Sequence, residues 1–363
     1  MLRRRAGTIA AQLLRDAPAG AITGIFAGGS VARGEVWAAE VAGVHEIYSD
    51  IDLYVLVADG ASLEAVRRVM RAATALPADD GGNVRFVRSV DAGVYTPADL
   101  RAQPMRPGTV DLRARRLVLA GDPAAIDACL PAPLPPAAEE ALYLLENRAW
   151  DALAAPPSTD TGRRAWKVFA YKVDLDIAAA HLIASGAGAE AVADPVTALA
   201  GSAGEHVPPD VAGRARVAAA ARAQLNAALA NDDVIARPPL ERLCAAWQRL
   251  APGILGAAAG ADLIAIRCAA GRRFRNLREF VRVASSRGMP RGVAVAGAVP
   301  RISRASRSVL RVHALVRGLE RAQLVDDAAL RAHLAQVEAV TRLLGFGGGA
   351  LDERARVAHD AIS

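Results

Sequence analysis

Two aspartates stand one residue apart at the start of an apolar run, in Ser-Asp-Ile-Asp-Leu-Tyr-Val at residues 49–55. On a β-strand the side chains alternate between faces, so Asp50 and Asp52 would project from the same face. Two carboxylates held so close repel each other unless a cation lies between them. Mg²⁺ prefers carboxylate oxygens and shares its other positions with water and phosphates. The pair therefore predicts a site for Mg²⁺ (or Mn²⁺).

A glycine-serine turn, Gly28, Gly29 and Ser30, precedes this pair. Glycine lets the backbone approach a phosphate closely, and the exposed N–H groups and the Ser30 hydroxyl can donate to its oxygens. A phosphate cradle followed by a metal-binding aspartate pair is typical of phosphoryl or nucleotidyl transfer. We expect a nucleoside triphosphate, with ATP as the first choice. The plainer alternative is an edge strand with two solvated aspartates.

Three further polar residues are candidates for the same site. Arg33 could contact a phosphate as a fork donor, and Glu35 could orient it or pair with it. A salt-bridged helix start would explain these two equally well. Lys172, one of only two lysines, could reach a triphosphate. Lys167 lies roughly 140° away around the same predicted helix, so both cannot face one ligand; a solvated surface lysine is the alternative for each.

The pattern of elements changes once along the chain. A length of 363 residues fits two domains, and residues 1–130 mix short strands with helices. The proline-rich stretch 131–136 is typical of a linker. Residues 137–363 have helical periodicity throughout, and this helical domain is expected to divide further near 200–210. The predicted fold class is α+β, a mixed-sheet domain followed by an all-helical domain. The strands expected are 21–26, 51–57, 84–90 and 117–120. The helices expected are 9–15, 63–76, 139–153, 163–185, 211–229, 240–250, 276–285, 303–319 and 327–344.

Composition excludes several classes of protein. No apolar run reaches the ~18–20 residues of a membrane helix, so no membrane insertion is expected. Gln12, Arg15 and Asp16 interrupt the region where a signal peptide would be apolar. Three scattered cysteines show neither metal-ligand spacing nor an even disulfide set, which suits a reducing interior. We expect a cytoplasmic protein.

An arginine-rich segment, 267–321, holds fourteen arginines against Glu279 and Glu320. Two stripes of helical spacing could grip RNA, but only Phe274 and Phe280 are available for base stacking. Arginines facing the acidic remainder of the protein, or water, explain the stripes without a ligand. Nucleic acid is therefore a possible partner but not the favoured one. The stripes consist of Arg275, Arg278 and Arg282, and of Arg304, Arg307 and Arg311.

The turn and the aspartate pair together resemble the nucleotidyltransferase superfamily, which includes DNA polymerase β and the aminoglycoside and lincosamide nucleotidyltransferases. Gly28, Gly29 and Ser30 match its turn, and Asp50 and Asp52 match its metal-binding pair. The long spacer and the Arg-Gly-Glu at 33–35 are similar to the antibiotic-type and polysaccharide-locus branches. Weaker similarity extends through 117–123 and the helix 166–186. The resemblance implies a nucleotidyltransferase-type sheet domain in 1–130, with an acceptor-binding or interaction domain after it.

The family also carries a third carboxylate near the pair. The predicted strand 84–90 contains no acid, and Asp91 at its far end would be remote from the metal. Asp111 stands where the polysaccharide-locus relatives carry an acidic residue, so the resemblance favours Asp111. The alternative for Asp111 is a turn or strand-edge residue paired with Arg113 or Arg115.

The function predicted is Mg²⁺-dependent transfer of a nucleotidyl group from a nucleoside triphosphate to a hydroxyl of an unidentified acceptor. Asp50, Asp52 and Asp111 would be catalytic, and Gly29 and Ser30 would hold the β- and γ-phosphates. One alternative is a catalytically degenerate nucleotide-binding or interaction protein on the same fold. Another is an RNA-binding or RNA-modifying protein that uses segment 267–321.

Overall fold

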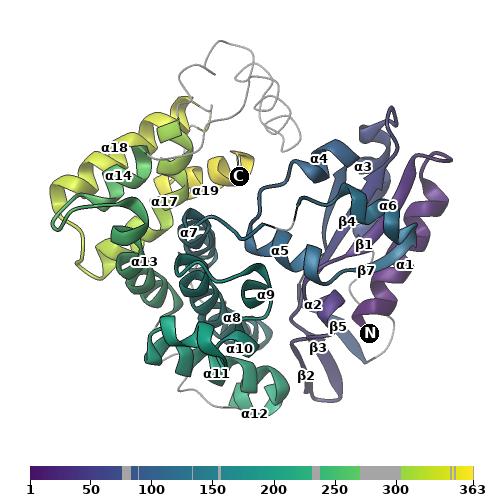
Figure 1. Cartoon of the computed structure of the whole chain (residues 1–363), viewed down its shortest axis with the longest axis horizontal. Helices are drawn as coiled ribbons and strands as arrows, with labels where there is room; N and C mark the ends of the chain where they lie inside the picture. Colours follow the sequence, from purple (N-terminus) through teal and green to yellow (C-terminus); the bar gives the residue numbers. More distant parts are fainter. Residues whose placement is uncertain are drawn as a thin grey trace. The chain divides into compact units, whose positions relative to one another are not determined.

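The computed structural model describes residues 1–75, 83–88, 90–132, 134–153, 157–230, 238–269, 304–343, 346 and 349–362. Within these residues the fold is α+β, with short strands in two mixed sheets and many helices. The chain forms two compact units (Figure 1). The first consists of Met1–Glu140 with Pro156–Ala236, and the second of Ala141–Ala155 with Arg237–Ser363.

The larger sheet of the first unit has the strand order β6-β4-β1-β7. β1 (Ile22–Ala27) is antiparallel to both β4 (Ile51–Val57) and β7 (Leu117–Gly121). β6 (Val90–Tyr95) is parallel to β4. β4 lies in the interior of this sheet, and its residues from Val55 to Val57 are buried on both faces, as expected for a strand that reads as a continuous apolar run.

The smaller sheet has the order β2-β3-β5. β2 (Ala38–Val41) and β3 (Val44–Ile47) form a hairpin, and β5 (Val84–Phe86) is parallel to β3. The two residues between β2 and β3, Ala42 and Gly43, both have positive φ, 52° and 78°. That is the conformation of the two-residue turn that matches the twist of a hairpin. The long spacer of the sequence is therefore an ordered hairpin.

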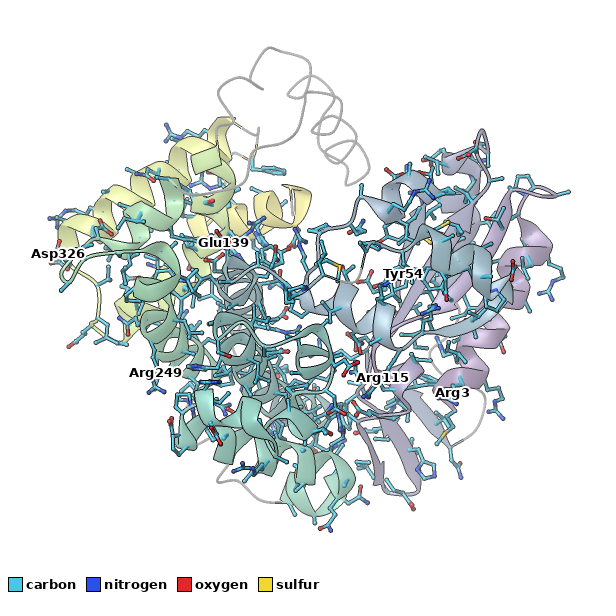
Figure 2. The ribbon with its side chains drawn as sticks, viewed as in Figure 1. Arg3, Tyr54, Arg115, Glu139, Arg249 and Asp326 are labelled. Atoms are coloured by element: carbon cyan, nitrogen blue, oxygen red, sulfur yellow. The ribbon has the colours of Figure 1, made fainter. Side chains whose placement is uncertain are left out.

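Helices cover both faces of the larger sheet. On one face α1 (Leu2–Asp16) and α3 (Leu63–Thr74) pack on alternate strand residues such as Ile25, Leu53 and Val55. The opposite face presents Phe26, Tyr54 and Leu56 to the apolar residues of shorter helices. These are α4 (Pro97–Arg101), α5 (Pro107–Ala114) and α6 (Pro123–Cys129). Tyr54 is labelled in Figure 2, where it lies among the strands.

The remaining elements of the first unit are helical. α8 and α11 pack on the β2–β3 hairpin through a cluster that contains Trp37, Tyr48, Val168, Tyr171 and Ala218. The elements are α2 (Gly29–Arg33), α8 (Asp160–Ala184), α9 (Ala189–Ala193), α10 (Pro195–Ala198), the 3₁₀ helix Ser202–His206, α11 (Pro209–Ala223) and α12 (Leu225–Ala230).

A buried carboxylate fastens α8 to the hairpin. Glu46 of β3 is only 2% exposed. Its oxygens accept hydrogen bonds from Nε and Nη2 of Arg164, at 2.9 and 2.8 Å, and from the hydroxyls of Thr161 and Tyr48. Burial alone would raise the pKa of Glu46, but the bonds from Arg164 and Tyr48 outweigh it and hold that pKa below its usual value. The carboxylate is therefore ionised in the folded unit.

The second unit is helical throughout its described residues. It consists of α7 (Glu139–Leu153) from Ala141 onward, α13 (Pro239–Leu255), α14 (Leu263–Ala269), α17 (Arg304–Arg321), α18 (Asp327–Leu343) and α19 (Leu351–Ile362). A polar chain crosses its interior. Asp352 Oδ1 lies 3.0 Å from Nε2 of His313, whose Nδ1 lies 3.3 Å from Nε2 of His333. Both histidines are buried, and the chain joins α19, α17 and α18.

The strong sequence patterns are confirmed. β4 and α7 have the predicted bounds, and β1, β7, α1, α3, α8, α13, α17 and α18 are present with shifted ends. The predicted helix 276–285 lies outside the described residues. The compact units do not divide at 131–136, because 156–236 groups with the sheets. No helix among the described residues is long and apolar enough to cross a membrane.

Replacing Arg164 by Met would remove the guanidinium that bonds both oxygens of the buried Glu46 carboxylate and would leave it Arg85, with Nη1 3.5 Å from Oε1. Breaking one side of a buried ion pair costs about 3–5 kcal/mol, so we expect a loss of this order in the free energy of unfolding, measured by urea denaturation. Arg163→Met is the matched control, because the Arg163–Asp160 pair is exposed and should contribute at most about 1 kcal/mol. Equal losses in the two variants would contradict the anchoring role of Glu46.

Acid should destabilise the protein through His333. Burial, with a smaller contribution from His313, lowers the pKa of His333 to about 3, whereas an unfolded histidine titrates near pH ~6.5. The unfolded state therefore binds the extra proton between these values, and stability falls as the pH drops, by up to about 1.4 kcal/mol per pH unit. Urea denaturation from pH 7 to pH 4 should show a shallower dependence for His333→Gln. Parallel curves for the two proteins would rule out this contribution.

Candidate functional site

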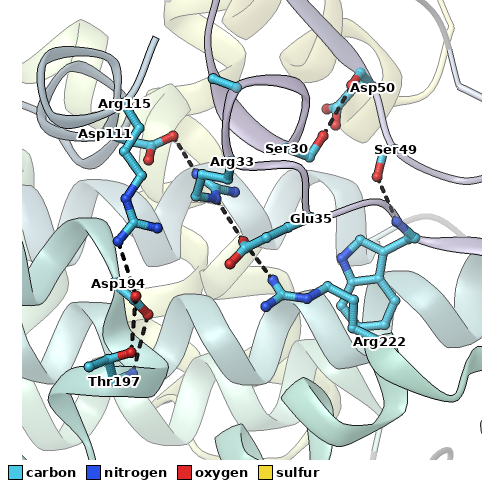
Figure 3. Close-up of polar contacts among 12 residues, drawn as sticks. Ser30, Arg33, Glu35, Ser49, Asp50, Asp111, Arg115, Asp194, Thr197 and Arg222 are labelled. Carbon is cyan, nitrogen blue, oxygen red and sulfur yellow. Dashed lines mark hydrogen bonds and ion pairs between the residues drawn. The ribbon is translucent and has the colours of Figure 1, made fainter. Parts of the chain in front are cut away.

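The glycine-serine turn lies against the first residues of β4. The backbone N–H of Gly28 donates to the carbonyl of Asp52 at 3.1 Å, and the Ser30 hydroxyl donates to the carbonyl of Asp50 at 3.4 Å (Figure 3). In an extended chain the carbonyls of residues i and i+2 point the same way, and their side chains share a face. The turn is thus bonded to the backbone of both aspartates, and the shared face of their side chains stays a prediction.

The side chain of Asp52 lies directly over Gly29. Gly29 has φ of +59°, and a Cβ atom built there would be 2.3 Å from Oδ2 of Asp52. No side chain fits in that space, and the left-handed conformation itself favours glycine. The residue type at this position is therefore dictated by the closeness of the turn to the carboxylate.

Asp91 stands beside Asp52 in the sheet. β6 begins at Val90, and Asp52 and Asp91 are register partners in the parallel pair β4–β6. Neighbouring strands lie about 4.8 Å apart, and paired residues project to the same face. Asp91 is exposed. The expectation that Asp91 is remote from the pair is therefore wrong.

The difference lies in the strands. The apolar pattern predicts one strand at 84–90, with Asp91 at its end. β5 in fact stops at Phe86 and belongs to the smaller sheet, whereas Asp91 is the second residue of a separate strand. The signal was present in the alternation of Val90, Ala92 and Val94, which all pack on the same apolar core.

Asp111 lies on the helix α5 and is paired with Arg33 (Figure 3). It is neither a turn nor a strand-edge residue, and its ion-pair partner is not Arg113 or Arg115. Burial raises the pKa of Asp111, and the positive charge of Arg33 opposes that rise only in part. Its Oδ1 atom is buried without a hydrogen-bond partner. Asp111 is thus engaged by Arg33.

The pKa of Tyr54 depends on the acidic residues on this face of the sheet. Burial raises its pKa most, and the negative charges of Asp52, Asp91 and Asp111 raise it further. Its ring stacks between those of Phe26 and Tyr95, at centroid distances of 5.3 and 5.7 Å. The carboxylates therefore lie around one aromatic ring and make this region a place where a cation would be stabilised.

Arg33 and Glu35, the predicted phosphate contacts, bind each other. Nε of Arg33 lies 2.7 Å from Oε2 of Glu35, and the same oxygen accepts from Nη1 of Arg222 at 2.8 Å (Figure 3). With Asp111 they form a chain of ion pairs that connects α2, α5 and α11. The described contacts favour a role in positioning the turn.

Lys172 of α8 reaches the aspartate pair. Its Nζ lies 3.6 Å from Oδ1 of Asp50 and 3.4 Å from the carbonyl of Tyr48. Lys167 on the same helix donates instead to the carbonyl of Leu229 at 2.7 Å. The prediction that the two lysines face different groups is confirmed.

The donor set suits a metal that is bound together with a phosphate. Among the described residues no group of three or more His, Cys, Asp or Glu side chains is arranged to hold a metal ion. Mg²⁺ is commonly held by one or two carboxylates, with water and substrate phosphates as the remaining ligands. Asp50 and Asp52 are two carboxylates of this kind, and the glycine-serine turn lies beside them.

The arginine-rich segment is partly described. Arg267 is buried and bound to Glu146, with Nε 2.6 Å from Oε1. Arg311 is also buried, with its guanidinium 4.5 Å from the ring centre of Tyr143. Residues 270–303, with Arg275, Arg278 and Arg282, lie outside the described part, as do the side chains of Arg304 and Arg307. Arg267 and Arg311 therefore belong to the interior of the second unit, and RNA binding by this segment stays a prediction.

Comparisons with protein-family models, with curated proteins and with solved structures found no match to this chain. A function therefore has to be inferred from the residues themselves.

Replacing Gly29 by Ala should disturb the site and the fold together. An alanine in the left-handed conformation costs about 1–3 kcal/mol, and its methyl group would displace the Asp52 carboxylate. We expect a lower free energy of unfolding in urea. Gly7→Ala is the matched control, because a Cβ at this helical position meets nothing within 4 Å and should add about 0.5–1 kcal/mol of stability. A Gly29→Ala protein as stable as the wild type would show that Asp52 is not held against the turn.

Proposed function

We propose that the first unit is a nucleotidyltransferase-type domain that binds a nucleoside triphosphate with Mg²⁺ and transfers its nucleotidyl group to an acceptor hydroxyl. One observation carries this proposal. The glycine-serine turn is bonded to the backbone of Asp50 and Asp52, and Asp91 stands in register beside Asp52. Carboxylates beside a glycine turn are the groups that phosphoryl chemistry uses.

The turn and Lys172 would bind the phosphates. Backbone N–H groups of Gly29 and Ser30 and the Ser30 hydroxyl are donors of the kind that hold phosphate oxygens. The ammonium of Lys172, which lies 3.6 Å from Asp50 Oδ1, can balance phosphate charge. ATP is the first nucleotide to try.

The carboxylates would orient the reacting groups. Mg²⁺, held by Asp50 and Asp52, would neutralise the charge of the phosphates while the hydroxyl attacks in line and pyrophosphate leaves. We assign the third carboxylate to Asp91 in place of Asp111, because Asp91 is exposed and adjacent to Asp52. Asp91 could accept the proton of the attacking hydroxyl.

Two findings favour a second candidate, a nucleotide-binding protein without catalysis. No three acidic side chains of the described residues converge as a metal site, and Asp111 is engaged by Arg33. In that case the nucleotide would bind, and no pyrophosphate would be released. The two candidates are separated by the same experiment.

Nucleotide binding should raise the thermal stability of the full chain. A ligand that binds only the folded state adds RT ln(1 + [L]/Kd), about 2.7 kcal/mol at a concentration of 100 Kd. ATP, CTP, GTP and UTP are each tested with Mg²⁺, and the Asp50→Asn/Asp52→Asn variant should lose the rise in melting temperature. An unchanged rise in that variant would show that the aspartates do not take part in binding.

Pyrophosphate release in the presence of a pool of cell metabolites then distinguishes the enzyme from the binding protein. Asp91→Asn should lower the release by at least about 100-fold, the scale of general base catalysis, while nucleotide binding persists. Asp59→Asn is the matched control, because Asp59 is exposed just beyond the other end of β4. Binding without release in the wild type would favour the non-catalytic candidate.

A further inference from the structure

Lys172 is held in position by contacts with Asp50 and with the backbone of Tyr48. Its side chain is 23% exposed. Its neighbours on α8, Tyr171 and Val173, are buried, and the ring of Tyr171 stacks on that of Trp37 at 6.0 Å. α8, the helix that carries Lys172, is therefore packed against Trp37, the residue just before β2.

Tyr48 contacts both Lys172 and the buried carboxylate of Glu46. The Tyr48 hydroxyl donates to Glu46 and accepts from Nε of Arg164 at 3.1 Å, and the Tyr48 carbonyl accepts from Lys172. Two residues later Asp50 presents its carboxylate to the same ammonium. The segment between β3 and β4 thus bonds to Arg164 of α8 and also to Lys172 of the same helix.

The charges at this place have a direct consequence. Asp50 and Asp52 are like charges on one face of β4 and need a cation nearby. The Lys172 ammonium supplies one positive charge at 3.6 Å from Asp50. A divalent ion that approaches Asp50 would meet that ammonium and be repelled by it. A triphosphate would attract both cations.

We propose that Lys172 is the counter-ion of Asp50 in the nucleotide-free protein and makes metal binding depend on nucleotide. On arrival of a triphosphate, the ammonium passes from Asp50 to a phosphate oxygen on its flexible four-carbon stem, and Asp50 becomes available to the metal. The inference rests on the proposed function for the identity of the nucleotide. It adds the order of events, in which metal binds with or after the nucleotide.

The test is Mn²⁺ binding to the full chain without nucleotide, measured from the electron paramagnetic resonance signal of free Mn²⁺. The wild type should bind weakly, and Lys172→Met should bind at least about 10-fold more tightly, a change of ~1.4 kcal/mol. Adding Asp50→Asn to Lys172→Met should abolish the gain. Lys172→Gln serves as a second variant if the methionine variant does not fold.

Lys167→Met is the matched control, because Lys167 is the other lysine of the same helix and bonds to Leu229. It should leave Mn²⁺ affinity at the wild-type value. Equal affinity of the wild type and Lys172→Met, or a gain that survives Asp50→Asn, would overturn the counter-ion role.

The result is independent of the nucleotide experiments. If Lys172→Met gains nothing while ATP still stabilises the wild type through Asp52, only the inference about Lys172 fails. If no nucleotide stabilises the protein but Lys172→Met gains an Asp50-dependent metal site, the proposed function fails and the counter-ion contact stands.

Discussion

The buried carboxylate of Glu46 is the interaction on which the first unit depends. A charge that is 2% exposed is tolerable only if every lone pair is used, and here Arg164, Tyr48 and Thr161 supply the donors. Glu46 itself lies on β3, and these donors come from the segment between β3 and β4 and from α8. The ionised group therefore sets the position of α8 along the hairpin, and with it the position of Lys172 relative to Asp50.

Two kinds of acidic residue lie around the turn, and their surroundings separate them. Asp111 is buried and paired with an arginine that is itself held by Glu35 and, through it, by Arg222. Such a chain fixes geometry, since removing one member leaves an uncompensated charge. Asp52 and Asp91 instead lie next to each other on adjacent strands, so their charges add. The first group suits support of the turn, and the second suits attraction of a cation.

Local sequence patterns predicted individual strands and helices better than they predicted which strands lie next to each other. β4 was predictable residue for residue because it combines a continuous apolar run with an acidic start, and α7 followed from its helical spacing. The neighbour of Asp52 was not predictable in the same way, because strand order and register depend on packing between distant segments. The sequence analysis assigns no helix to the residues around Asp111, although Pro107 is a common first residue of a helix, as it is in α5.

β6 is the outermost strand at one end of the described four-stranded sheet. A strand in that position offers backbone donors and acceptors to any other chain, and proteins often discourage such pairing with a charged side chain. Asp91 is an exposed charge on this strand. The carboxylate to which we assign a chemical role would thus also protect the chain from edge-to-edge aggregation, so selection against aggregation and selection for activity would act on one residue.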